Sequence, residues 1–133
     1  MKKKLLLINP VGRRSGYLMS RFSTFSPLGL AYVAAVTPQD WDVKIADENF
    51  EPFEMEPADL VAITAFTSNV NRAYEIAGMY RNQGTKVVMG GIHASMLPDE
   101  VRQYADAVVV GEVEGIWQEV LNDFSANQLK SKY

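Results

Sequence analysis

Apolar residues gather in four short and nearly continuous runs, a pattern typical of strands buried inside a parallel sheet. These runs cover residues 4–9, 60–66, 86–90 and 107–111. A fifth run, residues 41–47, instead alternates apolar with charged side chains. Because a strand with one wet face alternates in this way, we expect the fifth run to lie at an edge of the sheet.

Helical patterns separate the five predicted strands. We expect helices within residues 27–36, 70–83, 97–105 and 115–124. The second is capped by Ser68 or Asn69 and ends at Gly84. The segment between residues 50 and 57 contains two prolines, which predicts a short or irregular connection.

Strands that alternate with helices predict right-handed crossovers and a parallel sheet covered on both faces. We therefore expect an α/β fold of the flavodoxin-like, Rossmann-like type, a doubly wound five-stranded parallel sheet in the order 2-1-3-4-5 with three α/β/α layers. In such a fold the ligand crevice lies at the carboxyl ends of the strands, beside the first and third strands.

One domain is expected over residues 1–124, followed by a polar C-terminal tail or linker, residues 125–133, toward a missing domain. The helix at 27–36 has hardly a polar position, although a helix with one wet face normally has several. The connection from Val11 to Phe25 is long and carries three arginines. Long loops in compact domains are usually functional or docked on a partner, so both features predict a neighbouring domain.

Composition narrows the range of partners. The 133 residues carry a formal net charge of -3 and no basic stripe, so we expect no nucleic-acid partner. There is no cysteine, which removes disulfides, thiolate metal sites and cysteine nucleophiles. No stretch approaches the roughly 20 apolar residues that cross a bilayer, so we expect a cytoplasmic protein without a membrane partner.

The common ligands of this fold lack their residues here. A phosphorylated receiver needs acidic residues after the first strand, an aspartate after the third and a lysine after the fifth, and none of the three is present. The loop "NPVGRRSG" after the first strand contains one serine, whereas flavodoxins hold the flavin phosphate in a hydroxyl-rich loop. Neither GxGxxG nor GxxxxGK[ST] occurs.

Four segments carry a resemblance to a known family. They are "PLGLAYVAAV" at 27–36, "ITAFTSNV" at 63–70, "GGIHAS" at 90–95 and "VVVGEVEG" at 108–115. With these segments the chain resembles the N-terminal cobalamin (B12)-binding domain of cobalamin-dependent radical SAM proteins. That family includes methyltransferases and the anaerobic Mg-protoporphyrin IX monomethyl ester oxidative cyclase.

The resemblance implies a set of cofactor-binding residues. Thr64-Ala65-Phe66 stands where corrinoid-binding domains have SxL, and Gly90-Gly91 begins 26 residues after Thr64, the spacing of the family's GG motif. A hydroxyl at Thr64 is able to hydrogen-bond the nucleotide tail without placing a charge in the core. Glycines at 90 and 91 leave room for that tail between strand and helix.

Two further positions are implied at the mouth of the crevice. His93 would meet a corrin amide or a phosphate there, although a lone histidine at a helix start is usually a cap or a surface group. Glu112 lies in the segment "VVVGEVEG", and the resemblance makes it a further cofactor-binding candidate. For Glu112 and Glu114 the simpler explanation is that first-turn acids favour the N-terminus of the last helix.

The chain departs from the family pattern where DxHxxG is expected. The segment "DENFEP" keeps Asp47, but Asn49 replaces the histidine and Pro52 the glycine. An amide is a poor cobalt ligand compared with an imidazole. The resemblance therefore implies a base-off cobalamin without a histidine ligand, with Asn49 near the cobalt or holding a water.

The family's radical chemistry needs a CxxxCxxC site for a 4Fe-4S cluster that cleaves S-adenosylmethionine, and this chain has no cysteine. We therefore expect no catalytic residue and no protein metal ligand here, and a radical SAM domain as partner in cis or in trans. Either methyl transfer or the ring-forming oxidation of a porphyrin ester fits this half of such a protein. The alternative is a non-catalytic flavodoxin-like module that binds FMN, a nucleotide or another protein.

Overall fold

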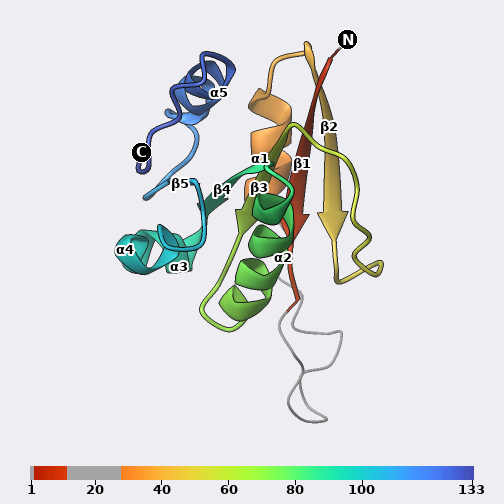
Figure 1. Cartoon of the computed structure of the whole chain (residues 1–133), viewed down its shortest axis with the longest axis vertical. Coiled ribbons are helices and arrows are strands. Elements are labelled where there is room, and N and C mark those ends of the chain that lie inside the picture. The colour runs from red at the N-terminus through yellow and green to blue at the C-terminus, as the bar shows by residue number, and fades with distance from the viewer. Residues whose placement is uncertain (1, 12–27) are drawn as a thin grey trace.

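A five-stranded parallel sheet forms the centre of the computed structural model, which describes residues 2–11 and 28–133 (Figure 1). Its strand order is β2-β1-β3-β4-β5, so the predicted order is confirmed. The strands are β1 (Lys3–Asn9), β2 (Trp41–Asp47), β3 (Leu60–Thr64), β4 (Lys86–Gly90) and β5 (Ala107–Val108). The helices are α1 (Leu28–Val36), α2 (Val70–Asn82), α3 (Ile92–Met96), α4 (Pro98–Val101) and α5 (Trp117–Ser125).

The predicted three layers follow from the alternation of side chains along β1. Leu5 and Leu7 pack with α1 and α5 on one face of the sheet. Leu6 and Ile8 pack with α2, α3 and α4 on the other face. Because neighbouring side chains of a strand point to opposite faces, a run that is apolar at every position fills two cores.

The third predicted helix, within residues 97–105, is shorter than expected, and a separate short helix that was not predicted precedes it. α3 begins at Ile92, directly after the two glycines, and ends at Met96, and α4 begins at Pro98. Leu97 between them has φ −131° and ψ 59°. A residue before proline is disfavoured in the α conformation, so the helix breaks at Leu97.

Residues 48–59 replace a helix between β2 and β3, as the two prolines predicted. Phe53 and Ala58 in this segment pack against the core on the α2 face. The hydroxyl of Tyr80, on α2, donates a hydrogen bond of 3.0 Å to the carbonyl oxygen of Glu56. This buried tyrosine therefore anchors the irregular segment to the helix beside it.

The last residues of the chain lie alongside β5. The amide of Val108 donates to the carbonyl oxygen of Ser131 at 3.0 Å, and the amide of Tyr133 donates to the carbonyl oxygen of Val108 at 2.8 Å. Val108 and Lys132 form a parallel bridge. These contacts cover the outer edge of the short strand β5. An uncovered sheet edge presents unpaired backbone groups that can pair with another chain, and the last residues protect β5 from this. The boundary at residue 124 and the role of residues 125–133 as a linker stay predictions.

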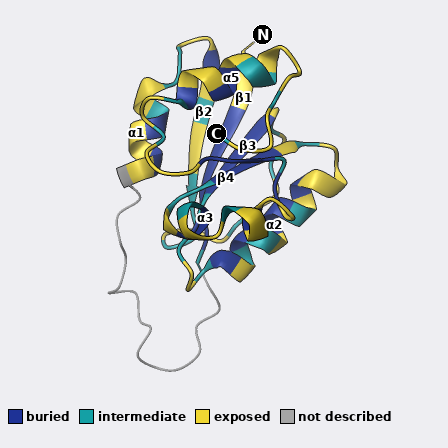
Figure 2. Cartoon of the chain, turned by 90° about the vertical axis from the view of Figure 1, so that its left-hand side faces the viewer, coloured by how far each residue is buried: buried dark blue, intermediate teal, exposed yellow. Residues whose placement is uncertain are grey.

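Helix α1 is apolar yet largely exposed (Figure 2). Leu30 and Val33 face the sheet, whereas Tyr32 is 42% exposed and Val36 37% exposed. The loop that, with this helix, predicted a neighbouring domain, from Val11 to Phe25, lies outside the described residues except for Val11. Within the described parts of the chain, no helix is long and apolar enough to cross a membrane.

We predict that Tyr80→Phe lowers the free energy of unfolding by about 1 kcal/mol, because it removes the hydrogen bond to residues 48–59. Urea unfolding measures the change. The control is Tyr104→Phe, since Tyr104 is partly exposed and stacks on Tyr74 with ring centroids 3.8 Å apart. If Tyr80→Phe lowers the free energy of unfolding no more than Tyr104→Phe does, the prediction is wrong.

Candidate functional site

A pocket of about 440 Å³ lies between α1 and α5, over the β3, β4 and β5 region of the sheet. We call it the α1–α5 pocket. Its floor consists of every second residue of β3 and β4, namely Ala62, Thr64, Val88 and Gly90, together with Val109 after β5. These positions share the sheet face that carries α1 and α5. Small-molecule sites occupy about 300–1,000 Å³, so the pocket is large enough for a cofactor fragment.

The deep walls of the α1–α5 pocket come from the two flanking helices. Leu30 and Val33 of α1 and Trp117 of α5 line it, and all three are buried. The indole N–H of Trp117 donates to the Thr37 hydroxyl oxygen at 2.9 Å. That hydroxyl donates in turn to the carbonyl oxygen of Val33 at 2.6 Å. Trp117 is thus held in place and presents ring carbon to the pocket.

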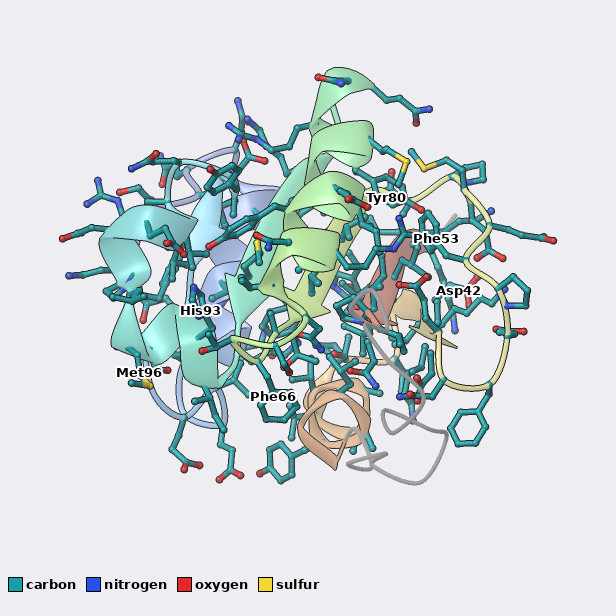
Figure 3. The ribbon with its side chains drawn as sticks, turned by 90° about the horizontal axis from the view of Figure 1, so that it is seen from below. Asp42, Phe53, Phe66, Tyr80, His93 and Met96 are labelled. Carbon is teal, nitrogen blue, oxygen red and sulfur yellow. The ribbon has the colours of Figure 1, made fainter. Side chains whose placement is uncertain are left out.

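The mouth of the α1–α5 pocket opens at the carboxyl ends of the strands, where α3 and residues 111–114 meet. Ile92 and Met96 of α3 line the mouth and are 56% and 71% exposed. Glu112 and Glu114 also line it and are exposed. The view along this edge shows His93 and Met96 on the same short helix (Figure 3).

The two glycines of the predicted motif have different surroundings. A Cβ on Gly90 would meet Val109 at ordinary contact distances of 3.9 and 4.0 Å. A Cβ on Gly91 would lie 2.7 Å from the Thr64 hydroxyl oxygen and 2.9 Å from the carbonyl oxygen of Ala65. Gly91 also has φ 99° and ψ −174°, a backbone conformation that is essentially restricted to glycine.

This difference corrects the expectation that both glycines simply leave room for a ligand. Gly90 leaves open space on the pocket floor. Gly91 is required by the backbone, because the turn from β4 into α3 brings it against Thr64 and Ala65. Both residues line the pocket, but a larger residue fits only at position 90 without moving the backbone.

Thr64 is the one floor residue with a polar side chain. It is half-buried at the carboxyl end of β3, and its hydroxyl forms no hydrogen bond with another residue in the described ranges. A hydroxyl both donates and accepts, so Thr64 offers the pocket one adaptable hydrogen-bonding group.

His93 belongs to a hydrogen-bonded cluster with Thr67, Tyr74 and Glu100, which we call the His93 cluster. It is 3% exposed, its Nδ1 lies 3.0 Å from the Thr67 hydroxyl oxygen, and its Nε2 lies 2.6 Å from Glu100 Oε2. Because a carboxylate only accepts, Nε2 donates to Glu100. His93 does not line the α1–α5 pocket, since its side chain faces α2 and α4.

The same cluster shifts two acid–base equilibria. The hydrogen bond from His93, followed by that from Tyr74, holds the pKa of Glu100 below its ordinary value. Burial, together with the hydrogen bond to Glu100, raises the pKa of Tyr74. The Tyr74 hydroxyl donates to Glu100 at 2.6 Å. Both shifts keep the carboxylate charged and the phenol neutral, so the cluster ties α2, α3 and α4 together at neutral pH.

The other predicted residues are spread along the carboxyl edge. Asn49 lies in the turn after β2, where its backbone and side-chain amides both donate to Asp47 Oδ1. Phe66 is half-buried in the loop after β3. Neither lines the α1–α5 pocket, whereas Thr64, Gly90, Gly91 and Glu112 do. The structure therefore brings four of the seven predicted residues together.

Several pocket residues escaped the sequence analysis, and strand periodicity was the signal that could have found some of them. Ala62 and Val88 stand two residues before Thr64 and Gly90, so they share the same face of the sheet. Trp117 had no comparable signal, because its place depends on how α5 packs across the sheet. Within residues 2–11 and 28–133, no group of three or more His, Cys, Asp or Glu residues is arranged to hold a metal ion.

We predict that Gly91→Ala lowers the free energy of unfolding by about 1–3 kcal/mol, the cost of a strained backbone conformation. At Gly90 the same substitution is neutral or stabilising by up to about 1 kcal/mol, because alanine suits a strand better than glycine. Urea unfolding of the two variants compares them directly. Equal effects at the two positions contradict the distinction between the glycines.

Comparison with known proteins identifies the family. Residues 14–121 match the B12 binding domain family. In Chlorobaculum tepidum, bacteriochlorophyllide d C-8(2)-methyltransferase is 37% identical over 108 residues, which are 80% of this chain and 24% of that enzyme. Bacteriochlorophyllide d C-12(1)-methyltransferase from the same organism is 34% identical over 135 residues, with 99% of this chain and 29% of that enzyme covered.

A third relative is an uncharacterized methyltransferase of Pyrococcus horikoshii, 36% identical over 118 residues, which cover 77% of this chain and 26% of the relative. The chain thus spans about a quarter of the length of these relatives. By its family match, which extends over most of its length, the chain belongs to the B12-binding domain family.

Proposed function

We propose that the chain binds cobalamin with its nucleotide tail in the α1–α5 pocket and serves as the cofactor-binding part of a longer B12-dependent radical SAM methyltransferase. The observation that carries the proposal is the pocket itself, an apolar cavity of about 440 Å³ that opens at the carboxyl edge of a B12-binding fold. In open α/β sheets this edge is the usual ligand position.

The residues of the pocket suit a flat, mostly apolar tail. Gly90 leaves the floor open where a side chain would project, with ordinary contact distances to Val109. Val88 and Trp117 offer apolar surface on the floor and the wall. Thr64 provides a hydroxyl for a hydrogen bond to the tail. We assign contact with the cofactor to Thr64, Gly90 and Glu112, and not to Asn49, Phe66 or His93.

The chain's own residues hold and orient the cofactor. Bound cobalamin supplies the cobalt chemistry, whereas the protein supplies binding, orientation and the exclusion of water. Trp117 and Leu30 exclude water from the deep part of the pocket because both are buried and apolar there. Gly91 and Ile92 shape the mouth through which the tail leads back to the rest of the molecule.

The proposed cobalamin is base-off and lacks a histidine ligand. The chain has one histidine, and both ring nitrogens of His93 are engaged by Thr67 and Glu100. The amide of Asn49 is engaged by Asp47 in a similar way. Both interactions support a lower cobalt face without a nitrogen ligand from His93 or Asn49.

A partner domain is proposed from the size of the relatives and from the surface of the chain. The chain spans about a quarter of relatives that are named methyltransferases, and two of these are named for bacteriochlorophyllide d. We propose methyl transfer as the reaction served, with the 4Fe-4S cluster and S-adenosylmethionine on the partner domain. The exposed apolar side chains Tyr32, Ile92 and Met96, which all line the pocket, support a docking surface beside it.

The alternative, an FMN or nucleotide module, finds less support in the charges of the pocket. Among the described residues, the charged side chains that line it are Glu112 and Glu114. A phosphate group there meets carboxylates and no lysine, arginine or histidine of the described chain, which disfavours an anion. Cobalamin avoids this conflict if its base enters the pocket and its phosphate stays outside.

A retention experiment tests the proposal. The purified 133-residue chain is mixed with hydroxocobalamin, desalted and examined by absorption spectroscopy, with FMN in a parallel sample. We expect a retained corrinoid spectrum of base-off character and no retained flavin. Loss of the corrinoid together with retention of FMN favours the alternative.

We further predict that Gly90→Val weakens cobalamin binding at least about tenfold, because the two methyl groups of the valine project over the pocket floor. The matched control is Gly78→Val, on α2, where a Cβ meets nothing within 4 Å. Titration followed by absorbance measures both affinities, and thermal unfolding verifies that both variants fold. If a folded Gly90→Val protein binds cobalamin with unchanged affinity, the nucleotide tail does not lie in the α1–α5 pocket.

A further inference from the structure

We propose that the α1–α5 pocket selects corrinoids by the base at the end of the nucleotide tail, and that it prefers an apolar benzimidazole to a purine. This inference rests on the proposed function, since it assigns a ligand preference to the same pocket.

The buried residues that line the pocket share one property: their side chains offer the ligand no polar atom. They are Leu30, Val33, Ala62, Val88, Val109 and Trp117. The indole N–H of Trp117, the one polar side-chain group among them, is already donated to Thr37. Whatever reaches the depth of the pocket therefore meets hydrocarbon and an aromatic ring.

The hydrogen-bonding side chains of the pocket are exposed or half-buried, and they include Tyr32 of α1, which is 42% exposed. Glu112 and Glu114 are exposed, and Ser95 is half-buried on α3 with its oxygen accepting a 2.8 Å hydrogen bond from the amide of Gly111. Thr64 stands at the carboxyl end of β3, on the part of the floor next to the mouth. It provides the one side-chain hydroxyl on the pocket floor, whereas Tyr32 and Ser95 belong to helices.

A detached dimethylbenzimidazole matches this arrangement. It has one bare ring nitrogen, which a single hydroxyl is able to satisfy, and two methyl groups that gain from apolar contact. Adenine in the same place carries an exocyclic amine and several ring nitrogens. Burying such groups without partners costs free energy, so a purine base is rejected by the apolar depth of the pocket.

The test compares three corrinoids on the 133-residue chain: hydroxocobalamin, its analogue with adenine as the lower base, and cobinamide, which lacks the nucleotide tail. Equilibrium titration followed by absorbance gives each affinity. We expect cobalamin to bind about 10- to 100-fold more tightly than the adenine analogue, the usual cost of one or more unpaired buried polar groups. Cobinamide is expected to bind more weakly than cobalamin.

Two valine-to-threonine variants assign the preference to the pocket. Val88→Thr places a hydroxyl on the pocket floor, and we expect it to narrow the ratio of the two affinities at least about threefold. Val87→Thr makes the same change one residue earlier, where the side chain is buried against α2 on the opposite face, and leaves the ratio unchanged. Because the variants use the same ligands, the ligands' own solution equilibria cancel from this comparison.

The outcomes separate the preference from the proposed function. Equal affinities for cobalamin and the adenine analogue, with cobinamide weaker than both, overturn the preference and leave the tail in the pocket. A ratio that changes equally in the two variants also overturns it, because the selection then lies elsewhere. Cobinamide binding as tightly as cobalamin, or no binding of any corrinoid, overturns the proposed function and the preference with it.

Discussion

The close approach of Gly91 to the end of β3 is the contact on which the geometry of the site depends. The amide of Ala65 donates to the carbonyl oxygen of Gly90, and the amide of His93 donates to the carbonyl oxygen of Ala65, each at 3.2 Å. These bonds continue the pairing of β3 and β4 beyond the strands and leave no space for a side chain at position 91. The chain therefore turns sharply out of the sheet, and α3 begins beside the pocket mouth instead of over the pocket floor.

The two faces of the sheet are completed in different ways. On one face α2, α3, α4 and residues 48–59 build a continuous core, in which Tyr80 is fully buried. On the other face α1 and α5 leave a cavity of about 440 Å³ above β3 and β4. The cavity opens at the carboxyl edge of the sheet, and a ligand that enters it removes the apolar side chains of its floor and deep walls from water. A ligand that fills the cavity completes this second core, and its binding stabilises the folded state.

Much of the fold was predictable because it follows from local patterns. The continuous apolar runs predicted the central strands, and the alternation in residues 41–47 predicted the edge position of β2. Helix α3 and the pairing of residues 131–133 with β5 were not predicted. The first depends on the glycine-restricted backbone of Gly91, which turns the chain out of the sheet, and the second on tertiary contacts that the polar tail sequence does not reveal.

The candidate site was predictable only in part, for a related reason. Thr64 and Gly90 were found through spacing and strand position, and both line the pocket. The direction of His93 was not predictable, because a five-residue helix presents one side to the pocket and the other to α2 and α4. The different roles of Gly90 and Gly91 depend on a backbone angle and on one short distance, neither of which appears in sequence letters.

The most direct test of the account is a crystal structure of the chain with cobalamin bound. The account predicts electron density for the benzimidazole between α1 and α5, in contact with Val88, Val109 and Trp117, and detached from the cobalt. Density that shows the benzimidazole coordinated to cobalt, or placed anywhere outside the α1–α5 pocket, contradicts it.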